Sequence, residues 1–180
     1  MALVKKELRE SGEKHSKPGE LGRISPPAFL LVQVGAHAAS KFAERLREIE
    51  LAPPHAGILR TLAAMPAITQ QALASALGTL PSRLVALVDE LESKGLVERQ
   101  SVEDDRRRYA LRLTETGIST LQSIGRIARE HEQMLLAALS GEEQRQLSVL
   151  LQRVAEEQRL MKGAHPGYGT PDSLGKSSKL

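Results

Sequence analysis

The sequence predicts a mainly α-helical protein with one small β-hairpin. Along most of the central chain, apolar residues recur at spacings of three and four, the repeat of one face of an α-helix. Only the stretch from residue 96 to residue 113 departs from this repeat, with two runs of strand character around a polar segment. The composition agrees with a helical protein, since the chain is rich in Ala and Leu and only 2% of its 180 residues are aromatic.

Both ends of the chain are polar and broken by helix-breaking residues. Residues 1–24 contain Gly12, Pro18 and Gly19, and residues 163–180 are similar in composition. We expect a flexible N-terminal arm, a folded domain over residues 25–162 and a flexible C-terminal tail. The tails also carry the excess positive charge, because residues 26–162 hold 17 Lys and Arg against 17 Asp and Glu.

Four helices are predicted before the hairpin. Ser25-Pro26 marks the start of the first, and Pro53-Pro54 ends it and starts the second, because a hydroxyl caps a helix and proline fits its first turn. Thr69 caps a short third helix that ends at Gly78, and the fourth runs from about Pro81 to Lys94. Their apolar faces comprise Leu30, Val34, Ala38, Phe42, Leu46 and Ile49, then Ile58, Leu59 and Leu62, then Leu73 and Leu77, and finally Leu84, Leu87, Val88 and Leu91.

The hairpin lies between the fourth helix and two further helices. LVERQ and RRYALRL have strand character and enclose the polar stretch SVEDDR. Thr114 caps the next helix, and Ser140-Gly141-Glu142-Glu143 forms a capping box that starts the last. We therefore expect a compact lobe over residues 55–113, with helices from residues 25–52 and 114–162 outside it.

The order helix, short helix, tight turn, helix and hairpin is that of a winged helix-turn-helix. An exposed helix face of this kind enters the major groove of DNA, and arginines on a hairpin tip reach phosphates or the minor groove. The hairpin holds the densest positive cluster of the chain, Arg106, Arg107 and Arg108. Two structural alternatives stay open: DDRRR as a solvated, self-paired turn, and the fourth helix as an ordinary amphipathic core helix.

The stretch ASALGTLPSRLVALVDELESKGLVERQSVEDDRRRYALRLTETG resembles the signature of the MarR (multiple antibiotic resistance regulator) family. The most specific pieces are LVDELESKGLVER, the DDRRR wing tip and LRLTETG. The resemblance covers roughly residues 28–161. It implies a triangular, pseudo-twofold dimer, palindromic DNA operators and, in many members, a small phenolic or aromatic effector.

The resemblance also implies roles for individual residues. Asp105, Arg106 and Arg107 match the acid and arginines of the wing tip, with Arg108 beside them. Ser82 and Arg83 match early recognition-helix positions, and Gln71 and Ser75 match positions that approach the DNA backbone. The chain departs from the family at Ala86, where a polar or basic residue is common, and at Leu80, where a Ser or Thr cap is common. We expect Thr79 to take over that cap and to join the DNA-binding residues.

The first helix and the last two carry more apolar surface than a small DNA-binding lobe needs, which favours a homodimer. An effector pocket is expected between these helices and the lobe, with His37, His55, Ile58, Leu59 and Arg60 as candidates by position. A lone histidine is more often packed or capping than ligand-binding. The spacing of the five histidines predicts no metal site, and nothing in the sequence predicts a cofactor.

The prediction is thus a homodimeric, sequence-specific regulator that binds a palindromic operator in double-stranded DNA, a repressor relieved by a small-molecule effector. The alternative is a winged-helix protein-interaction module without specific DNA binding. An enzyme is not expected, because the chain has no cysteine and no GxSxG, HExxH or P-loop motif. No run of about 18 apolar residues and no apolar N-terminal segment occurs, so we expect a cytoplasmic protein without a membrane span.

Overall fold

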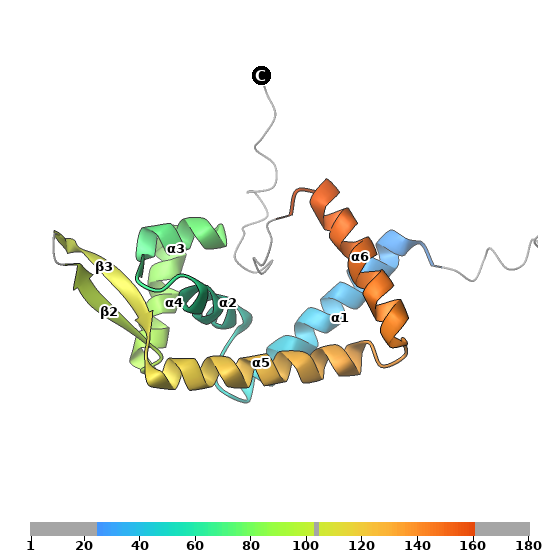
Figure 1. Ribbon diagram of the computed structural model, residues 1–180, viewed down its shortest axis with the longest axis horizontal. Coiled ribbons are helices and arrows are strands. Elements are labelled where there is room, and N and C mark those ends of the chain that lie inside the picture. The colour runs from blue at the N-terminus through green and yellow to red at the C-terminus, as the bar shows by residue number, and fades with distance from the viewer. Residues whose placement is uncertain (1–24, 103–104, 161–180) are drawn as a thin grey trace, which may run out of the picture. The chain divides into compact units, whose positions relative to one another are not determined.

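The computed structural model describes residues 25–102 and 105–160 (Figure 1). Their mainly helical fold with a small antiparallel sheet confirms the predicted class. The expected arm and tail, residues 1–24 and 163–180, lie outside the described residues. The elements in chain order are α1 (Pro27–Arg47), α2 (Pro53–Ala64), β1 (Ile68–Thr69), α3 (Gln70–Leu77), α4 (Pro81–Ser93), β2 (Val97–Val102), β3 (Asp105–Leu113), α5 (Glu115–Leu135) and α6 (Gly141–Glu157).

The chain divides into two compact units, Met1–His37 and Ala38–Leu180. The described part of the first unit contains the N-terminal half of α1. This half-helix exposes large apolar side chains that a helix in water does not normally show together: Phe29, Leu30, Leu31, Val32 and Val34. It therefore carries an apolar surface that its own unit leaves open to solvent.

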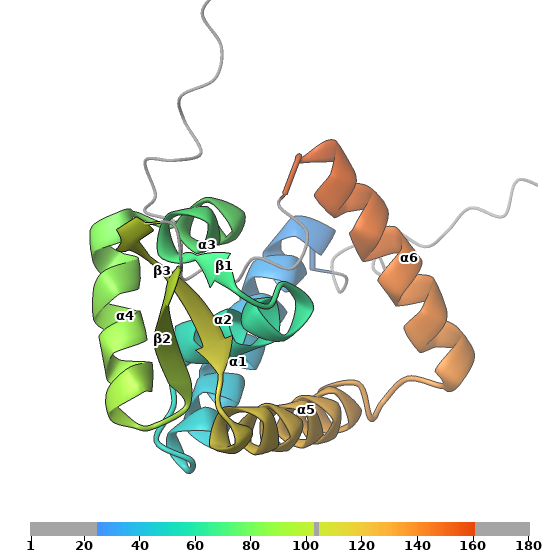
Figure 2. The same cartoon turned by 60° about the vertical axis from the view of Figure 1, so that its left-hand side comes forward.

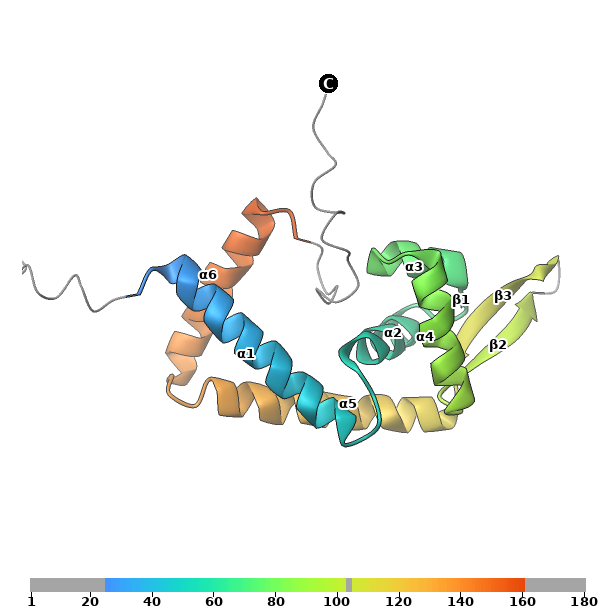
Figure 3. The same cartoon turned by 180° about the vertical axis from the view of Figure 1, so that it is seen from behind.

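The second unit is built around one hydrophobic core. In Figure 3, α2 lies among α4, α5 and the sheet, and it supplies the fully buried Ile58 and Leu59. Leu84, Val88 and Leu91 of α4 pack into the same core from one helix face, as their spacing predicts. The other fully buried side chains are Leu46, Leu62, Leu73, Val97 and Leu111.

The helix boundaries follow the predicted caps, with two corrections. Helix α1 ends at Arg47 and is followed by a turn at residues 48–50, whereas the prediction had it end at Pro53. The Thr69 hydroxyl accepts a hydrogen bond from the Ala72 N–H at 3.3 Å, and Ser140 forms the expected capping box with Glu143. Thr79, by contrast, does not cap α4. Its N–H donates to the Ala74 carbonyl at 3.0 Å, so Thr79 closes α3. Its hydroxyl is buried without a hydrogen-bond partner among the described residues, and the N-cap residue of α4, Leu80, provides no side-chain cap.

The sheet is larger than the sequence predicted. It has three strands in the order β1-β3-β2, with Ile68 of β1 opposite Leu111 of β3. A strand of two residues shows no alternation, so β1 could not be seen in the sequence. The stretch SVEDDR was also expected to lie wholly between the strands, but pairing extends to Val102 opposite Asp105, with a bulge between Ser101 and Val102. Figure 2 shows α4 alongside this hairpin.

A tight joint connects the base of the hairpin to α5. Gly95, with a left-handed φ of +67°, turns the chain from α4 into β2. The Thr114 hydroxyl donates to the Gly95 carbonyl at 2.6 Å, and the Thr114 N–H donates to the Leu96 carbonyl at 3.2 Å. A Cβ atom on Gly117 would collide with the same Leu96 carbonyl oxygen. The first turn of α5 therefore lies directly on backbone and leaves no room for a side chain.

The last helix, α6, buries none of its residues. Val149, Leu150, Leu151 and Val154 are all exposed. An isolated helix of 17 residues gains little stability without a packed apolar face. Among the described residues, no single helix is long and apolar enough to cross a membrane; α3 and α4 pass that test only as a pair bent by 111°.

The joint at Gly117 predicts that a glycine-to-alanine substitution in a helix lowers the stability of the protein. Replacing a helical glycine by alanine ordinarily stabilises a protein by about 0.5–1 kcal/mol. We expect Gly117→Ala instead to lower the free energy of unfolding by about 1–3 kcal/mol, because the methyl group meets backbone that must shift. Urea denaturation at one protein concentration measures this change.

Gly125→Ala on the same helix is the matched control. A Cβ there meets only the flexible end of Arg129 at 3.5 Å, an ordinary contact. This variant should be as stable as the wild type or more so. Equal effects of the two substitutions would show that the joint at Leu96 tolerates a side chain.

Candidate nucleic-acid interface

The exposed side of α4 begins at a helix N-terminus without a side-chain cap. Ser82 and Arg83, both predicted site residues, lie exposed in this first turn, and Ala86 follows them on the exposed surface. The free N–H groups and the helix dipole favour a negative group at this end. The hydroxyl of Ser82 and the guanidinium of Arg83 can each donate a hydrogen bond to a phosphate or to a base edge.

Helix α3 adds two more exposed side chains. Gln71 and Ser75 are exposed, and the Ser75 hydroxyl donates to the Gln71 carbonyl at 3.2 Å, which leaves its lone pairs open. Thr79 differs from these residues, because its buried hydroxyl does not reach the exposed surface. The expectation that its side chain binds DNA therefore has no support in the fold.

The predicted wing tip is described only in its backbone. Asp105, Arg106, Arg107 and Arg108 belong to β3, so the cluster lies on the outer part of a strand rather than in a long loop. Their side chains are outside the described part of the structure. Their roles stay a prediction.

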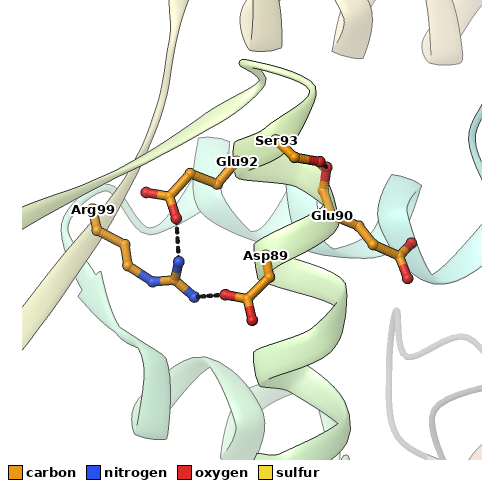
Figure 4. A network of polar contacts seen from close by, with 5 residues as sticks. All are labelled: Asp89, Glu90, Glu92, Ser93 and Arg99. Atoms are coloured by element: carbon orange, nitrogen blue, oxygen red, sulfur yellow. Dashed lines mark hydrogen bonds and ion pairs between the residues drawn. The ribbon is translucent and has the colours of Figure 1, made fainter.

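A three-residue network ties the hairpin to α4 (Figure 4). The Arg99 guanidinium, on β2, donates to the Asp89 carboxylate at 2.5 Å and to the Glu92 carboxylate through a second nitrogen. Burial acts to lower the pKa of Arg99, but the bonds and charges of Asp89 and Glu92 outweigh it and raise the pKa above its ordinary value. The cation is therefore permanent and shared by two acids.

This network was missed by sequence analysis. A usable signal was present. Asp89 and Glu92 are three residues apart and so lie on one helix face, and the glycine turn at Gly95 sends β2 back along that face. An arginine early in such a strand comes opposite the two acids.

His55, a candidate for the effector pocket, has a structural role. Only 5% of the residue is exposed, and its Nδ1 accepts a hydrogen bond from the Ala52 N–H at 3.1 Å, which closes the first turn of α2. Its Nε2 lies 3.0 Å from Glu90 of α4. Burial lowers the pKa of His55, and the Glu90 carboxylate raises it only part of the way back. Because Nδ1 accepts a hydrogen bond, the neutral ring carries its proton on Nε2, which lies close to Glu90 without the geometry of a hydrogen bond.

The other pocket candidates are not among the residues that line the described cavity. Ile58 and Leu59 are core residues without exposed surface, and His37 and Arg60 are exposed. A cavity of about 400 Å³ does occur elsewhere, beside the joint to α5. It is lined by Ile49, Glu50, Leu51, Lys94, Leu96, Ser119, Thr120 and Ser123, none of which was predicted. Among the described residues, no cluster of His, Asp or Glu could hold a metal ion.

The environment of His55 predicts a pH-dependent stability. With its pKa below the ordinary 6.5 in the folded state, the unfolded chain binds the proton more tightly. The stability that neutral His55 contributes is therefore present above about pH 6.5 and is lost as the pH falls through the lowered pKa. The thermal midpoint of the wild type should fall more steeply between about pH 7.5 and 5.5 than that of His55→Gln.

Glutamine is a suitable control because it accepts the same bond at the third helical position and does not titrate. Circular dichroism melts at constant ionic strength make the comparison. Parallel pH profiles of the two proteins would exclude His55 as the titrating group.

Comparisons with known proteins agree with this geometry. The sequence profile of the MarR family matches residues 49–108, which run from the end of α1 to the arginines of the wing. A curated relative from Thauera aromatica, described as a putative transcriptional regulatory protein for the hcr operon, is 35% identical over 140 residues. The alignment covers 77% of this chain and 81% of that protein.

Solved structures of similar fold include two informative cases. MepR of S. aureus, in a crystal structure of a MepR–DNA complex, is 26% identical with a TM-score of 0.63, covering 74% of this chain and 99% of that one. The PcaV transcriptional regulator from Streptomyces coelicolor is 25% identical with a TM-score of 0.64, covering 75% and 98%. Together with the relative from Thauera aromatica, the exposed α4 and the paired hairpin, these matches show that the chain belongs to the MarR family of winged helix-turn-helix transcription regulators.

Proposed function

We propose that this regulator binds a palindromic operator in double-stranded DNA as a homodimer and represses transcription. The observation that carries the proposal is the exposed, uncapped start of α4, where Ser82 and Arg83 lie on the same lobe as the arginine-bearing hairpin. The relative MepR is crystallised with DNA. In this chain, α4 would enter the major groove and the hairpin would reach the adjacent phosphates or minor groove.

The homodimer is supported by the apolar surface at both ends of the folded domain. Helix α6 buries none of its own residues but exposes Val149, Leu150, Leu151 and Val154, and the first half of α1 exposes Phe29 and its neighbours. Each face needs a cover to be stable in water. A second copy of the chain supplies such a cover and would set two recognition helices about 34 Å apart, one turn of DNA.

Relief of repression by a small aromatic or phenolic effector is the finer part of the proposal. An effector would act by binding better to a dimer whose two recognition helices no longer match the operator spacing. Of the predicted contacts, His55, Ile58 and Leu59 are buried, and none of the five candidates lines the described cavity. This part of the proposal therefore rests on the family alone.

The test is a fluorescence-anisotropy titration with DNA fragments from around the protein's own coding region, at two salt concentrations. Tight binding to particular fragments that weakens steeply with salt is expected, because phosphate contacts release counterions. Weak and equal binding to every fragment would instead favour the alternative, a winged-helix module that binds protein.

Two arginine variants separate base contacts from phosphate contacts. Arg83→Ala should cost about 1–3 kcal/mol of operator binding and relax base preference, which is the loss expected for an arginine that pairs with a guanine. Arg107→Ala should weaken binding to all sequences alike and reduce the salt slope by about 1. Unchanged base selectivity in Arg83→Ala would remove Arg83 from the readout.

A further inference from the structure

The acids of α4 pose a problem for a helix that meets DNA. Asp89, Glu90 and Glu92 all lie on the C-terminal half of α4, within one turn of one another. Carboxylates near DNA repel its phosphates, so neutral side chains at these positions would favour DNA binding. Each of them nevertheless has a partner in the fold, which indicates a role within the protein.

Two of these acids hold a single guanidinium from the hairpin. In Figure 4, Asp89 and Glu92 point toward Arg99, while Glu90 points away from it. The two carboxylates bond different nitrogens of Arg99, so the planar fork is fixed in both position and orientation. The Arg99 side chain is 20% exposed, whereas Asp89 is 57% exposed, so the cation is partly enclosed by its acids.

Arg99 also lies at the point along β2 where the hairpin leaves the hydrophobic core. It lies opposite Leu111 of β3, whose side chain is fully buried. The next pair outward is Gln100 opposite Ala110, and beyond it Tyr109 is 47% exposed. Among the described side chains of β2, Arg99 is the outermost that is bonded to another element. The segment beyond it, residues 100–109, carries the wing arginines.

We propose that Arg99 is a positioning residue for DNA binding, which locks the hairpin to the recognition helix through Asp89 and Glu92 and so fixes the spacing between Arg83 and the wing arginines. The inference rests on the proposed function. Arg99 itself makes no contact with DNA in this scheme. A partly exposed ion pair adds little to global stability, so its effect should appear in the geometry of binding.

The decisive variant removes the acids and leaves Arg99 in place. Asp89→Asn combined with Glu92→Gln makes the protein more positive by two charges, which by simple electrostatics strengthens its binding to DNA. If Arg99 is a positioning residue, the double variant should instead bind DNA more weakly. We expect operator binding to weaken roughly tenfold, the size of one lost contact, with a salt slope lowered by about 1 because the wing no longer reaches its phosphate. Tighter or unchanged operator binding would overturn the proposal.

Two further variants control for charge and for folding. Glu98→Gln removes one exposed acid from the residue next to Arg99, and it should bind operator as tightly as the wild type or more tightly. Arg99→Lys keeps the charge but replaces the fork by a single ammonium. It should lose less operator affinity than the double variant. Full wild-type affinity would contradict the need for Arg99 to bond both Asp89 and Glu92.

A measurement without DNA separates this inference from the proposed function. Hydrogen exchange in the double variant should quicken at the amides of β2 and β3 and remain unchanged in α2, with circular dichroism confirming that the helices are intact. Unchanged exchange in the hairpin would refute the lock even if DNA binding is confirmed. If the wild type binds no DNA fragment, the proposed function fails, while faster hairpin exchange would still establish the Arg99 lock.

Discussion

The contact between the first turn of α5 and the backbone at Gly95 and Leu96 is the constraint on which the arrangement of the second unit depends. At this joint the end of α4, the start of β2 and the start of α5 meet through backbone atoms and one hydroxyl, Thr114. Backbone contacts cannot change rotamer as long side chains do. The direction in which α5 leaves the lobe is therefore fixed by the same few residues that end the recognition helix.

Two side-chain ties extend this rigidity along α4. Arg99 holds its outer face to the hairpin through Asp89 and Glu92, and His55 of α2 lies 3.0 Å from Glu90 on another side. Helix α4 is thus held by the hairpin, by α2 and by the joint to α5, which come from different parts of the sequence. Its exposed N-terminal turn, with Ser82 and Arg83, remains the part without such ties. A helix held firmly at one end and open at the other suits recognition of a ligand by that open end.

The parts that sequence analysis predicted well are those governed by local chemistry. Proline pairs, hydroxyl caps and apolar spacing located each helix of the described residues, since such signals act within one or two turns, although α1 ends at Arg47 and not at Pro53 as predicted. The Thr79 cap failed because that residue serves the preceding helix, and two helices compete for the same short linker. Strand β1 and the network of Arg99 depend on contacts far apart in sequence, which spacing alone does not reveal. The contact of His55 with Glu90 of α4 is also distant in sequence, whereas its bond to the Ala52 N–H spans only three residues.

The effector pocket stays a prediction, and two of its candidates belong to the hydrophobic core. Position within α2 predicted that Ile58 and Leu59 would face a pocket, but an apolar residue on a central helix is equally suited to the core, and the core took both. The cavity that does occur lies beside the joint, between the chain before α2, the end of α4 and the start of α5. Its lining includes Leu96. The carbonyl of Leu96 accepts a hydrogen bond from the Thr114 N–H and lies against Gly117. Any change of shape there would act on α4, the hairpin and α5 together, whereas a change among the core residues of α2 would first have to disturb close packing. The described cavity thus adjoins the joint and lies away from the residues that sequence position singled out.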